Sequence, residues 1–405
     1  MDASARGTHF IGLMSGTSLD AVDGVLLSPT NTPTGPGWAV SAHAAEPLPS
    51  ALRTLFLSLN SPGPNELHQA AVAGHQLAHL YAQVCQRLLA RAGLTAADVA
   101  AIGAHGQTVR HHPPGAVCLG VAVDADNPNS PPYTLQINQP ALLAELTGIP
   151  VVADFRSADI AAGGQGAPLV PVFHQAVFGE PGASVAVVNI GGIANITGLP
   201  AHGPVWGLDT GPGNMLLDLW CAQHTGNPYD ANGAWGAQGT VSLELLSAFK
   251  ADPYFARQGA KSTGRDLFNH RWLEGHLLAL NHPLAASDVQ ATLVQLTVDT
   301  ITDGLTQGDW GATPPTSVWV CGGGALNGEL MRGLQNRLPH IPVRSTAERG
   351  WSVDQVEAAA FAWLARARWL GEVTAGLPVV TGARGARCLG ALYPARGSGP
   401  LGVRR

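Results

Sequence analysis

Charged side chains are scarce in this sequence. Asp, Glu, Lys and Arg make up 12% of its 405 residues, about half of the usual share of ~25%. The 22 basic residues are outnumbered by 28 acidic ones, which gives a formal net charge of −6. Because nucleic acids and anionic membranes are bound by basic surfaces, neither is expected as a partner. Hydrophobic residues reach 45%, so a chain that is disordered as a whole is excluded.

Cysteine is also rare, and a long uninterrupted apolar segment is missing. The five cysteines lie far apart without a C-x-x-C pair, which indicates reduced thiols of a cytosolic protein rather than a disulfide framework or a zinc site. Residues 1–16 reach glycine and polar side chains too early for the apolar centre of a signal peptide. The uncharged segment 181–208 is interrupted by Pro, Asn and Gly, so it is no membrane helix. We predict a cytoplasmic location with no membrane partner.

Glycine, by contrast, is abundant, with 50 glycines beside 30 prolines. Four segments combine an apolar strand with a glycine turn, namely residues 9–27, 99–109, 184–198 and 317–327. The first and third predict β-hairpins, because a second apolar run follows each turn. The second and fourth predict buried strands that lead into loops, each after an amphipathic helix.

This repeated order of hairpin, helices and strand predicts an α/β fold with two duplicated α/β domains. The length also agrees with two domains of ~100–200 residues each. We place the first domain at residues 1–150, the second at residues 151–393 and a flexible tail at residues 394–405. The helix before the last of the four strands is expected to begin at Ser287, because Gln290 three residues later completes a capping-box pattern.

The turn in residues 12–23 reads GLMSGTSLDAVD and predicts an anion site. Successive backbone N–H groups and the hydroxyls of its serines and threonine form a cradle suited to phosphate oxygens. Asp20 and Asp23 follow directly, and carboxylates beside a phosphate site hold Mg²⁺ through water. The alternative is an ordinary hairpin turn with surface aspartates.

A second glycine turn, NIGGIAN, spans residues 189–195. Gly191 and Gly192 allow a ligand to touch the backbone, while Asn189 and Asn195 can donate hydrogen bonds to phosphate. A glycine bulge within a sheet is an equally simple interpretation.

A third glycine turn, CGGGALN, spans residues 321–327 and precedes a helix expected at residues 329–338. Such a junction lets a flat ring or a ribose lie against bare backbone. It matches neither the P-loop nor the complete Rossmann fingerprint. The residues expected to contact the nucleotide here are Gly322, Gly323, Gly324 and Asn327.

Asp209 is the candidate general base. We expect it to end a short apolar strand at residues 205–208 and to precede a Gly-Pro-Gly turn that leads to a helix at Met215. A carboxylate that is fixed at the end of a rigid strand and faces a glycine-lined space has the position expected of a general base. The alternative role is the common one of an aspartate before glycine, which caps a helix or forms a turn.

Polar residues also gather in residues 153–171, where a glycine run leads into an apolar strand bounded by prolines. Polar groups on a bend near a domain junction suit a sugar, whereas the alternative is an inter-domain hinge with local salt bridges. The candidate sugar contacts in this segment are Asp154, Arg156, Asp159, Gly164, Gln165 and Gly166.

Two other segments have a plainer interpretation. Residues 261–265, KSTGR, contain one of the two lysines and indicate a surface loop. His105 stands at a strand end, and we expect a buried histidine with satisfied hydrogen bonds rather than a ligand contact.

Taken in this order, two hairpin cradles, an aspartate and an adenosine-type glycine turn resemble the superfamily of sugar kinases, seventy-kilodalton chaperones and actin. Its members have an actin-like, ribonuclease H-like fold and bind ATP in a cleft between two duplicated domains. The spelling of the motifs is more specific, since residues 10–393 resemble the anhydro-N-acetylmuramic acid kinase family. The matching motifs are MSGTSLDAVD, AHGQTV, ADFR-x-x-DIAAGGQGAPLVP, NIGGIANIT, DTGPGN, DPYF with KSTGR, DVQATL and CGGGALN.

The resemblance implies an activity and its participants. Enzymes of this family use ATP and water to open the 1,6-anhydro ring of anhydro-N-acetylmuramic acid. The product is N-acetylmuramic acid 6-phosphate, in a step of bacterial cell-wall (peptidoglycan) recycling. ATP, Mg²⁺ and an amino sugar are therefore the expected ligands, and a homodimer is the expected assembly.

The resemblance also implies residue roles. Asp209 matches the catalytic base, Glu357 falls where the family has an acidic residue near the sugar, and residues 163–168 match a segment that lines the cleft. Ala21 stands where the family commonly has Gly, which is tolerated if its φ is negative, and residues 116–132 form a longer loop insertion than usual. The ATP-phosphate turn corresponds to Gly16, Thr17, Ser18, Leu19, Asp20, Ala21, Val22 and Asp23, with Asp20 as the candidate water-mediated Mg²⁺ ligand.

Two other functions fit part of this pattern. Another small-molecule kinase of the same superfamily would act on a free hydroxyl or carboxylate, and only ring-opening hydrolysis places solvent oxygen on the anomeric carbon. A non-enzymatic ATP switch, such as a chaperone-like or sugar-sensing regulator, is disfavoured. We see neither a peptide-binding appendage after the second domain nor room for a helix-turn-helix before the first strand.

Overall fold

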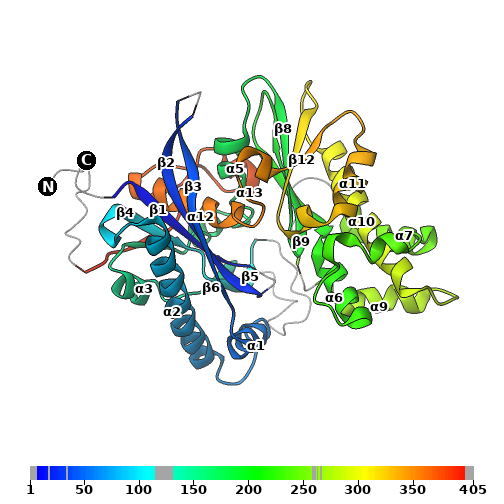
Figure 1. Cartoon of the computed structure of the whole chain (residues 1–405), viewed down its shortest axis with the longest axis horizontal. Coiled ribbons are helices and arrows are strands. Elements are labelled where there is room, and N and C mark those ends of the chain that lie inside the picture. Colours follow the sequence, from blue (N-terminus) through cyan, green and yellow to red (C-terminus); the bar gives the residue numbers. More distant parts are fainter. Residues whose placement is uncertain are drawn as a thin grey trace. The chain divides into compact units, whose positions relative to one another are not determined.

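The structure is a computed structural model that describes residues 7–16, 19–32, 35–114, 131–257, 261, 263–264 and 267–396. The chain forms two compact units (Figure 1). The first unit consists of Met1–Phe173 together with Gln355–Arg405, and the second is the continuous segment His174–Asp354. In sequence, therefore, the second unit is inserted into the first.

The first unit is built on a six-stranded sheet. Strand β1 pairs antiparallel with β2, and β2 with β3. On its other side β1 runs parallel to β4, β4 runs parallel to β7, and β13 completes the sheet as an antiparallel edge strand. In sheet order the strands are β13 (Ala391–Tyr393), β7 (Val151–Ala153), β4 (Val99–Ala104), β1 (His9–Ser15), β2 (Ala21–Thr32) and β3 (Gly35–Pro47).

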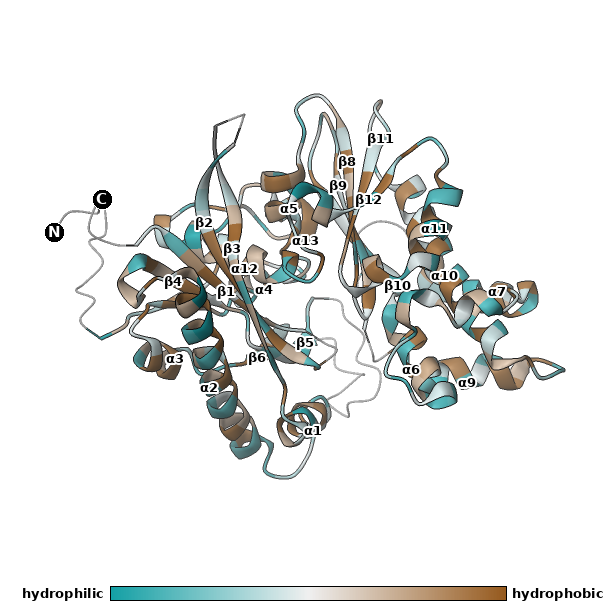
Figure 2. Cartoon of the chain, in the orientation of Figure 1, coloured by the Kyte–Doolittle hydropathy of each residue, from teal (hydrophilic) through white to brown (hydrophobic). Residues whose placement is uncertain are grey.

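Helices and a small separate hairpin complete the first unit. The longest helix is amphipathic: Leu77, Tyr81 and Leu88 are fully buried on one face, and Figure 2 shows hydrophilic and hydrophobic residues on different sides of it. It ends at Gly93, whose φ of +66° is the left-handed conformation of a helix C-cap. The elements are α1 (Ser50–Ser58), α2 (Glu66–Ala92), η2 (Ala96–Asp98), β5 (Gln107–His112), β6 (Tyr133–Ile137), α3 (Pro140–Thr147), α4 (Ser157–Ala161), α5 (Pro171–Phe178), which crosses into the second unit, α12 (Val356–Leu370) and α13 (Leu377–Thr381).

Two glycines allow α12 to lie directly on the strands. A Cβ atom on Gly12 of β1 would overlap the backbone oxygen of Ala358, and one on Gly103 of β4 would overlap the backbone oxygen of Phe361. Neither strand position can carry a side chain at this separation. The close contact fixes the start of α12, and with it Glu357, against the strands of the first sheet.

The second unit repeats the plan of the first. Strand β8 pairs antiparallel with β9, β9 pairs antiparallel with β10, and on the other side β8, β11 and β12 run parallel. The strands are β10 (Trp206–Pro212), β9 (Ile193–Leu199), β8 (Ser184–Ile190), β11 (Pro315–Cys321) and β12 (Val343–Ser345). The helices are α6 (Asn214–Thr225), η3 (Ala231–Gly233), η4 (Gly236–Gln238), α7 (Leu243–Lys250), α8 (Pro253–Ala256), α9 (His270–Ala279), α10 (Ala286–Gln307), η5 (Gly323–Leu326), α11 (Gly328–Arg337) and η6 (Thr346–Arg349).

The two sheets share one topology. Within each unit the strands are ordered third, second, first, fourth and fifth, as β3-β2-β1-β4-β7 and as β10-β9-β8-β11-β12. The prediction of two duplicated α/β domains is thereby confirmed, and so are both hairpins and both buried strands. Each unit has its own apolar core, centred on residues such as Ile11 and Tyr81 in the first and on Val188 and Phe249 in the second.

The predicted domain boundaries were wrong. The boundary at residue 150 separates β7 from its own sheet, since β7 pairs with β4, and the end at residue 393 assigns α12 and β13 to the wrong unit. A strand of three residues carries no periodicity that would reveal its partner. The predicted insertion at 116–132 and tail at 394–405 lie mostly outside the described residues.

Two local predictions also differ from the structure. Helix α10 begins at Ala286, so Ser287 is not its N-cap, and Asp288 instead accepts a hydrogen bond from the backbone of Thr240 (2.7 Å). Gln290 is fully buried within α10 rather than part of a capping box. No strand follows the glycine run, because α5 begins at Pro171 directly after an irregular segment.

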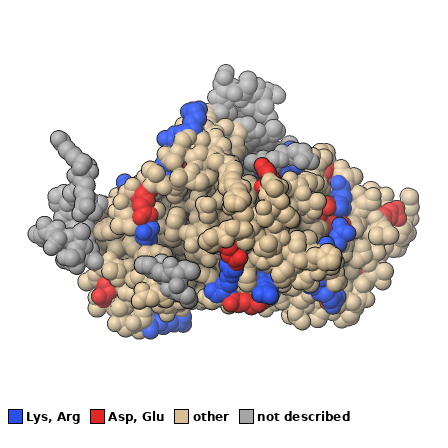
Figure 3. Space-filling view, turned by 90° about the horizontal axis from the view of Figure 1, so that it is seen from above, with Lys and Arg blue, Asp and Glu red and all other residues tan. Residues whose placement is uncertain are grey.

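The surface reflects the low charge of the sequence. On the face in Figure 3, basic and acidic side chains are interspersed among a majority of uncharged residues. Among the described helices, none is both long and apolar enough to cross a membrane.

Candidate active site

The first predicted phosphate turn joins β1 to β2. The amide of Leu19 donates to the carbonyl of Gly16 (3.2 Å), and Leu19 is buried with a φ of +58°. A non-glycine residue in this conformation costs on the order of 1–3 kcal/mol and persists where its surroundings fix it. Ala21 does not take positive φ and begins β2, so its methyl group is accommodated. Thr17 and Ser18 lie outside the described residues.

The two carboxylates of this turn differ in surroundings. The side chain of Asp20 is 67% exposed, and its nearest cation is Arg53 at 3.8 Å. Oδ1 of Asp23 lies 3.3 Å from Nε2 of His43. No group of three or more His, Cys, Asp or Glu side chains converges within the described residues. Magnesium usually keeps several waters and takes only one or two carboxylates beside substrate phosphates, so the open Asp20 fits a water-mediated role.

The loop between β4 and β5 is tied to the end of β1. Oγ of Ser15 donates to the carbonyl of Gly106 (3.2 Å), and the amide of Gly106 donates to the hydroxyl of Tyr81 (3.2 Å). Burial raises the pKa of Tyr81 to about 12, so this hydroxyl is neutral. The amide of His105 donates to the carbonyl of Leu13 in β1 (3.1 Å). His105 and Gly106 are therefore fixed beside the strand that leads into the first turn.

His105 is buried and hydrogen-bonded at both ring nitrogens, as the sequence predicts. Its Nδ1 donates to the carbonyl of Gly106 (2.7 Å), which leaves Nε2 as an acceptor. Nε and Nη2 of Arg156 both donate to that Nε2, at 3.1 and 2.9 Å. Burial, and then the positive charge of Arg156, hold the pKa of His105 well below its usual value. The neutral imidazole thus orients the guanidinium of Arg156.

The glycine run after α4 is held through its peptide groups. Nη1 of Arg156 donates to the carbonyl of Gly166 (2.7 Å), and the amide of Gly166 donates to Oδ2 of Asp159 (2.8 Å). Asp159 is buried, and its Oδ1 accepts from the hydroxyl of Thr381 (2.7 Å). The amide of Gln165 donates to the carbonyl of Thr381 (2.8 Å). Asp159 therefore positions the loop, and a sugar contact of its own stays a prediction.

The other sugar candidates of the first unit lie near helix starts and in the same loop. Asp154 has a φ of +56°, and its Oδ1 is 3.4 Å from the amide of Ser157, where α4 begins. The amide of Gly164 donates to the backbone carbonyl of Asp159 (2.9 Å). Glu357 occupies the first turn of α12. The structure thus gathers Arg156, Asp159 and residues 164–166 into one hydrogen-bonded cluster, and a sugar contact of Glu357 stays a prediction.

Three predicted residues form a row across the sheet of the second unit. Asn189 on β8 is in register with Asn195 on β9, which is in register with Asp209 on β10. On the other side Asn189 is in register with Cys321, the last residue of β11. Residues directly opposite on neighbouring strands share one face of a sheet. The asparagine amides and the carboxylate of Asp209 therefore leave the sheet on the same side.

The glycine turns of this unit converge beyond the same strands. The amide of Asn214 donates to the carbonyl of Gly191 (2.8 Å), and its Nδ2 donates to the carbonyl of Ile190 (3.0 Å). Gly322 has a φ of +78°, and a Cβ atom on Gly322 would meet the carbonyl of Ile190 at 2.6 Å. A Cβ atom on Gly324 would overlap the side chain of the same isoleucine. The three turns that follow β8, β10 and β11 thus contact one another through backbone atoms that no side chain covers.

Asn327, at the end of the third glycine turn, is used by the helix that follows. Its Oδ1 accepts hydrogen bonds from the amides of Glu329 (3.0 Å) and Leu330 (3.3 Å) and caps α11. Because these bonds occupy the side-chain oxygen, Asn327 fixes the position of the turn, and a nucleotide contact of its own stays a prediction.

Asp209 is held by a segment that follows α7. Its Oδ2 accepts from the amide of Thr263 (3.0 Å), and its amide donates to the carbonyl of Lys261 (2.9 Å). Its carbonyl accepts from the hydroxyl of Tyr254 (2.7 Å), whose pKa is raised by burial and then by the charge of Asp209. The described residues of KSTGR are irregular and partly exposed, as a loop predicts, but the sequence did not predict that backbone groups of Lys261 and Thr263 hold the candidate base.

The strand that carries Asp209 is longer than predicted. Asp209 lies in the middle of β10, not at the end of a strand over residues 205–208. After a register shift, Gly211 and Pro212 still pair with β9, and Gly211 has a φ of +147° that most side chains avoid. The helix begins at Asn214 rather than Met215.

Tyr254 is the functional neighbour that sequence reasoning missed. It stands in α8, whose N-cap is Asp252, with Oδ1 accepting from the amide of Tyr254 (2.9 Å) and Oδ2 accepting from Nε1 of Trp272 (2.9 Å). Aspartate followed by proline is a signal for a helix start. That signal was available in DPYF and would have predicted the short helix, although not its contact with Asp209.

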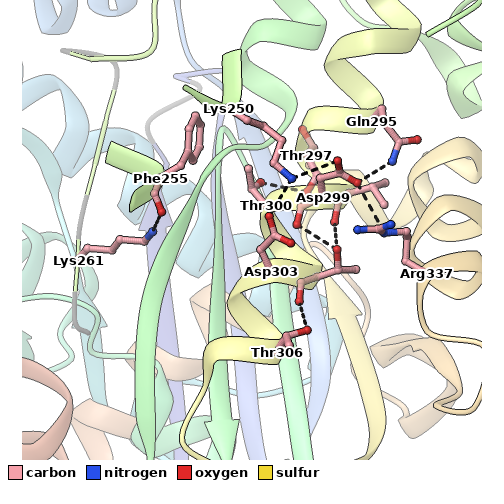
Figure 4. A network of polar contacts seen from close by, with 12 residues as sticks. Lys250, Phe255, Lys261, Gln295, Thr297, Asp299, Thr300, Asp303, Thr306 and Arg337 are labelled. Carbon is pink, nitrogen blue, oxygen red and sulfur yellow. Dashed lines mark hydrogen bonds and ion pairs between the residues drawn. The ribbon is translucent and has the colours of Figure 1, made fainter. Parts of the chain in front are cut away.

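A charged network joins three helices of the same unit (Figure 4). Lys250 of α7 lies 2.9 Å from Asp303 and 3.4 Å from Asp299 of α10, and Arg337 of α11 lies 3.6 Å from Asp299. Burial works to lower the pKa of Lys250, but the hydrogen bond of Asp303 and the charges of both aspartates raise it on balance. Figure 4 shows Lys261 apart from this network, with its ammonium directed to the carbonyl of Phe255 (3.4 Å).

The sequence comparisons identify the family. The family model described as anhydro-N-acetylmuramic acid kinase matches residues 8–395. The chain belongs to this family. An anhydro-N-acetylmuramic acid kinase of Bordetella pertussis strain Tohama I is 54% identical over 98% of this chain and 100% of the relative. Another, of Variovorax paradoxus strain S110, is 52% identical over 96% of this chain and 100% of the relative.

Solved structures resemble the chain more distantly. The activator of the 2-hydroxyisocaproyl-CoA dehydratase from Clostridium difficile, with bound ADPNP, is 12% identical, with a TM-score of 0.43 over 89% of this chain and 96% of that one. Membership of the anhydro-N-acetylmuramic acid kinase family therefore rests on the sequence matches, which span nearly the whole chain.

Proposed function

We propose that this chain uses ATP and water to open the 1,6-anhydro ring of anhydro-N-acetylmuramic acid and to phosphorylate O6. The products are N-acetylmuramic acid 6-phosphate and ADP. Family membership supports the substrate. The observation that carries the chemistry is the row of Asn189, Asn195 and Asp209 on one face of a sheet, beside three converging glycine turns.

The substrate dictates what the base must do. O6 is part of an internal acetal, so it carries no hydroxyl proton for a kinase base to remove. Water attacks the anomeric carbon, the bond from that carbon to O6 breaks, and O6 forms its new bond to the γ-phosphorus as the bond to ADP breaks. Asp209 accepts the proton that the water loses. One carboxylate is sufficient for both bond changes.

The contacts around Asp209 suit this role. The amide of Thr263 fixes Oδ2 and the backbone of Asp209 is held on both sides, so the carboxylate cannot swing away. Such positioning is what separates an effective general base from a solvated carboxylate. The N–H groups of Gly191, Gly192, Gly323 and Gly324 are proposed to bind phosphate oxygens and the nucleoside, whereas the amide of Gly322 donates to the carbonyl of Val353 (2.8 Å) and fixes the turn.

In the first unit, the turn that begins at Gly16 is proposed to bind phosphate, and Arg156 is proposed to bind the sugar. Arg156 is oriented by His105, and Asp159 fixes the adjacent loop. Asp20 is the residue that would hold Mg²⁺ through water, and the ion would neutralise charge on the phosphates. A cytoplasmic location and a homodimer complete the proposal, and light scattering of the purified protein tests the latter.

Labelled water distinguishes this reaction from its rivals. The protein is incubated with ATP, anhydro-N-acetylmuramic acid and H₂¹⁸O, quenched rapidly, and the product is fragmented in a mass spectrometer. We expect ¹⁸O on the anomeric carbon and none in the phosphate. A phosphorylated product without solvent oxygen would indicate a kinase that acts on a free group, and ATP hydrolysis independent of the sugar would indicate an ATP switch.

A further inference from the structure

Outside the candidate active site, two histidines face one another on α2. His75 and His79 are both exposed and lie one helical turn apart. Their Nε2 atoms are 3.2 Å apart, and their ring centroids are separated by 4.8 Å. In a helix, residues four apart share one face, so the two exposed rings lie on the same side of α2.

This separation matches that of two ligands on one metal ion. Imidazole nitrogens bind zinc at about 2.0–2.1 Å. Two nitrogens at this distance from one ion and 3.2 Å from each other subtend an angle of about 100° at the metal, close to that of tetrahedral coordination. The distance between the two nitrogens therefore suits the binding of both to one ion.

The helix presents the pair rigidly. The face opposite the two histidines is anchored in the core of the first unit, where Leu77, Ala78 and Tyr81 are fully buried. The backbone positions of both histidines are therefore fixed before a metal binds, which reduces the entropy lost on binding.

We propose that His75 and His79 form a bidentate site for a divalent transition-metal ion. Imidazole ligands favour Cu²⁺, Ni²⁺ and Zn²⁺, whereas Mg²⁺ prefers oxygen ligands. Among the described residues no third His, Cys, Asp or Glu joins the pair, so water completes the coordination. The alternative is that one Nε2–H simply donates a hydrogen bond to the other ring.

Titration with Ni²⁺ tests the site on the full chain, prepared without a histidine tag and freed of metal with a chelator. Calorimetry is expected to detect one more Ni²⁺ ion per chain in the wild type than in the variant with His75→Gln and His79→Gln. Each single substitution is expected to weaken this site at least tenfold, whereas Mg²⁺ is not expected to compete. His68→Gln, an exposed position on the same helix, is the matched control and should retain the site.

A rescue variant separates chelation from general surface binding. Gln83 is exposed and lies one turn beyond His79, so Gln83→His in the His75→Gln background creates a new pair four residues apart and should restore the lost site. Paramagnetic broadening by Ni²⁺ should then move from the His75 and His79 resonances to those of the new pair. Equal stoichiometry and affinity in the wild type and the double variant would overturn the proposal, as would failure of the rescue.

Discussion

At the scale of single residues, the side chains nearest the candidate chemistry are fixed by backbone groups and by neutral partners. Asp209 is held by the amide of Thr263 and the hydroxyl of Tyr254, and Arg156 is held by a neutral imidazole. The sequence predicted the buried, hydrogen-bonded state of His105 correctly, while the role of Asp209 as base stays a prediction. It did not predict Tyr254 or Thr263, since both reach Asp209 from 45 or more positions away along the chain.

Replacement of Asp209 by Asn tests its role as base. Asn keeps the shape of the side chain and an oxygen for the amide of Thr263, but it cannot accept a proton. We expect kcat to fall by at least ~10²–10⁴-fold, while ATP and sugar still bind, as measured by calorimetry. Asp309→Asn, an exposed position that binds the amide of Gly311, is the control. Activity of Asp209→Asn within a few-fold of the wild type would mean that another group takes the proton.

At the scale of elements, the repeated topology was predictable and the packing of α12 was not. Hairpins are encoded locally, since a glycine turn between two apolar runs fixes both strands. The sequence around Glu357 reads as an ordinary helix, and nothing in it tells which sheet the helix covers. The position of α12 depends on Gly12 and Gly103, because only glycine leaves room for the helix at these two strand positions. This relation is visible only in the three-dimensional structure.

Gly12→Ala is the test of this close contact. The added methyl group would overlap the backbone oxygen of Ala358, which cannot move without shifting α12. We expect the free energy of unfolding to fall by about 1–3 kcal/mol, as for other overpacked cores, measured by denaturant titration. Gly275→Ala is the matched control, because Gly275 lies within α9 with open space around it. There the same change should stabilise by ~0.5–1 kcal/mol, and equal effects at both sites would refute the packing argument.

At the scale of the whole molecule, buried histidines make stability depend on pH. Burial lowers the pKa of His174 to about 3, and burial followed by the charge of Arg156 lowers the pKa of His111 to about 4. The pKa of His105 is lowered for the same two reasons, burial and then the charge of Arg156. In the unfolded chain a histidine has a pKa of about 6.5. Below that pH these histidines bind protons in the unfolded state but not in the folded state. Their contribution to stability is therefore complete above pH ~6.5 and is lost as the pH falls toward their pKa values in the folded state.

The size of this loss is measurable. Between pH 7.5 and pH 5, His111 and His174 should each reduce the free energy of unfolding by about 2 kcal/mol, as followed by tryptophan fluorescence in denaturant. His174→Gln removes one of these groups and should make the decrease smaller. His68→Gln, at an exposed position of α2, reports the effect of losing a surface imidazole. A pH dependence that is identical in the wild type and in His174→Gln would exclude His174 as a source.

The insertion of one unit within the other has a consequence for biosynthesis. The ribosome delivers β1, β2 and β4 early, but α12, which covers Gly12 and Gly103, begins only at Val356, about 250 residues after β4 ends at Ala104. At ~5–20 residues per second, this delay is on the order of ten to fifty seconds. The inserted unit is one continuous segment and can fold before synthesis of the chain is complete. Until α12 is made, the face of the first sheet that carries Gly12 and Gly103 has no helix to cover it. We therefore expect chaperones to bind the first unit during synthesis.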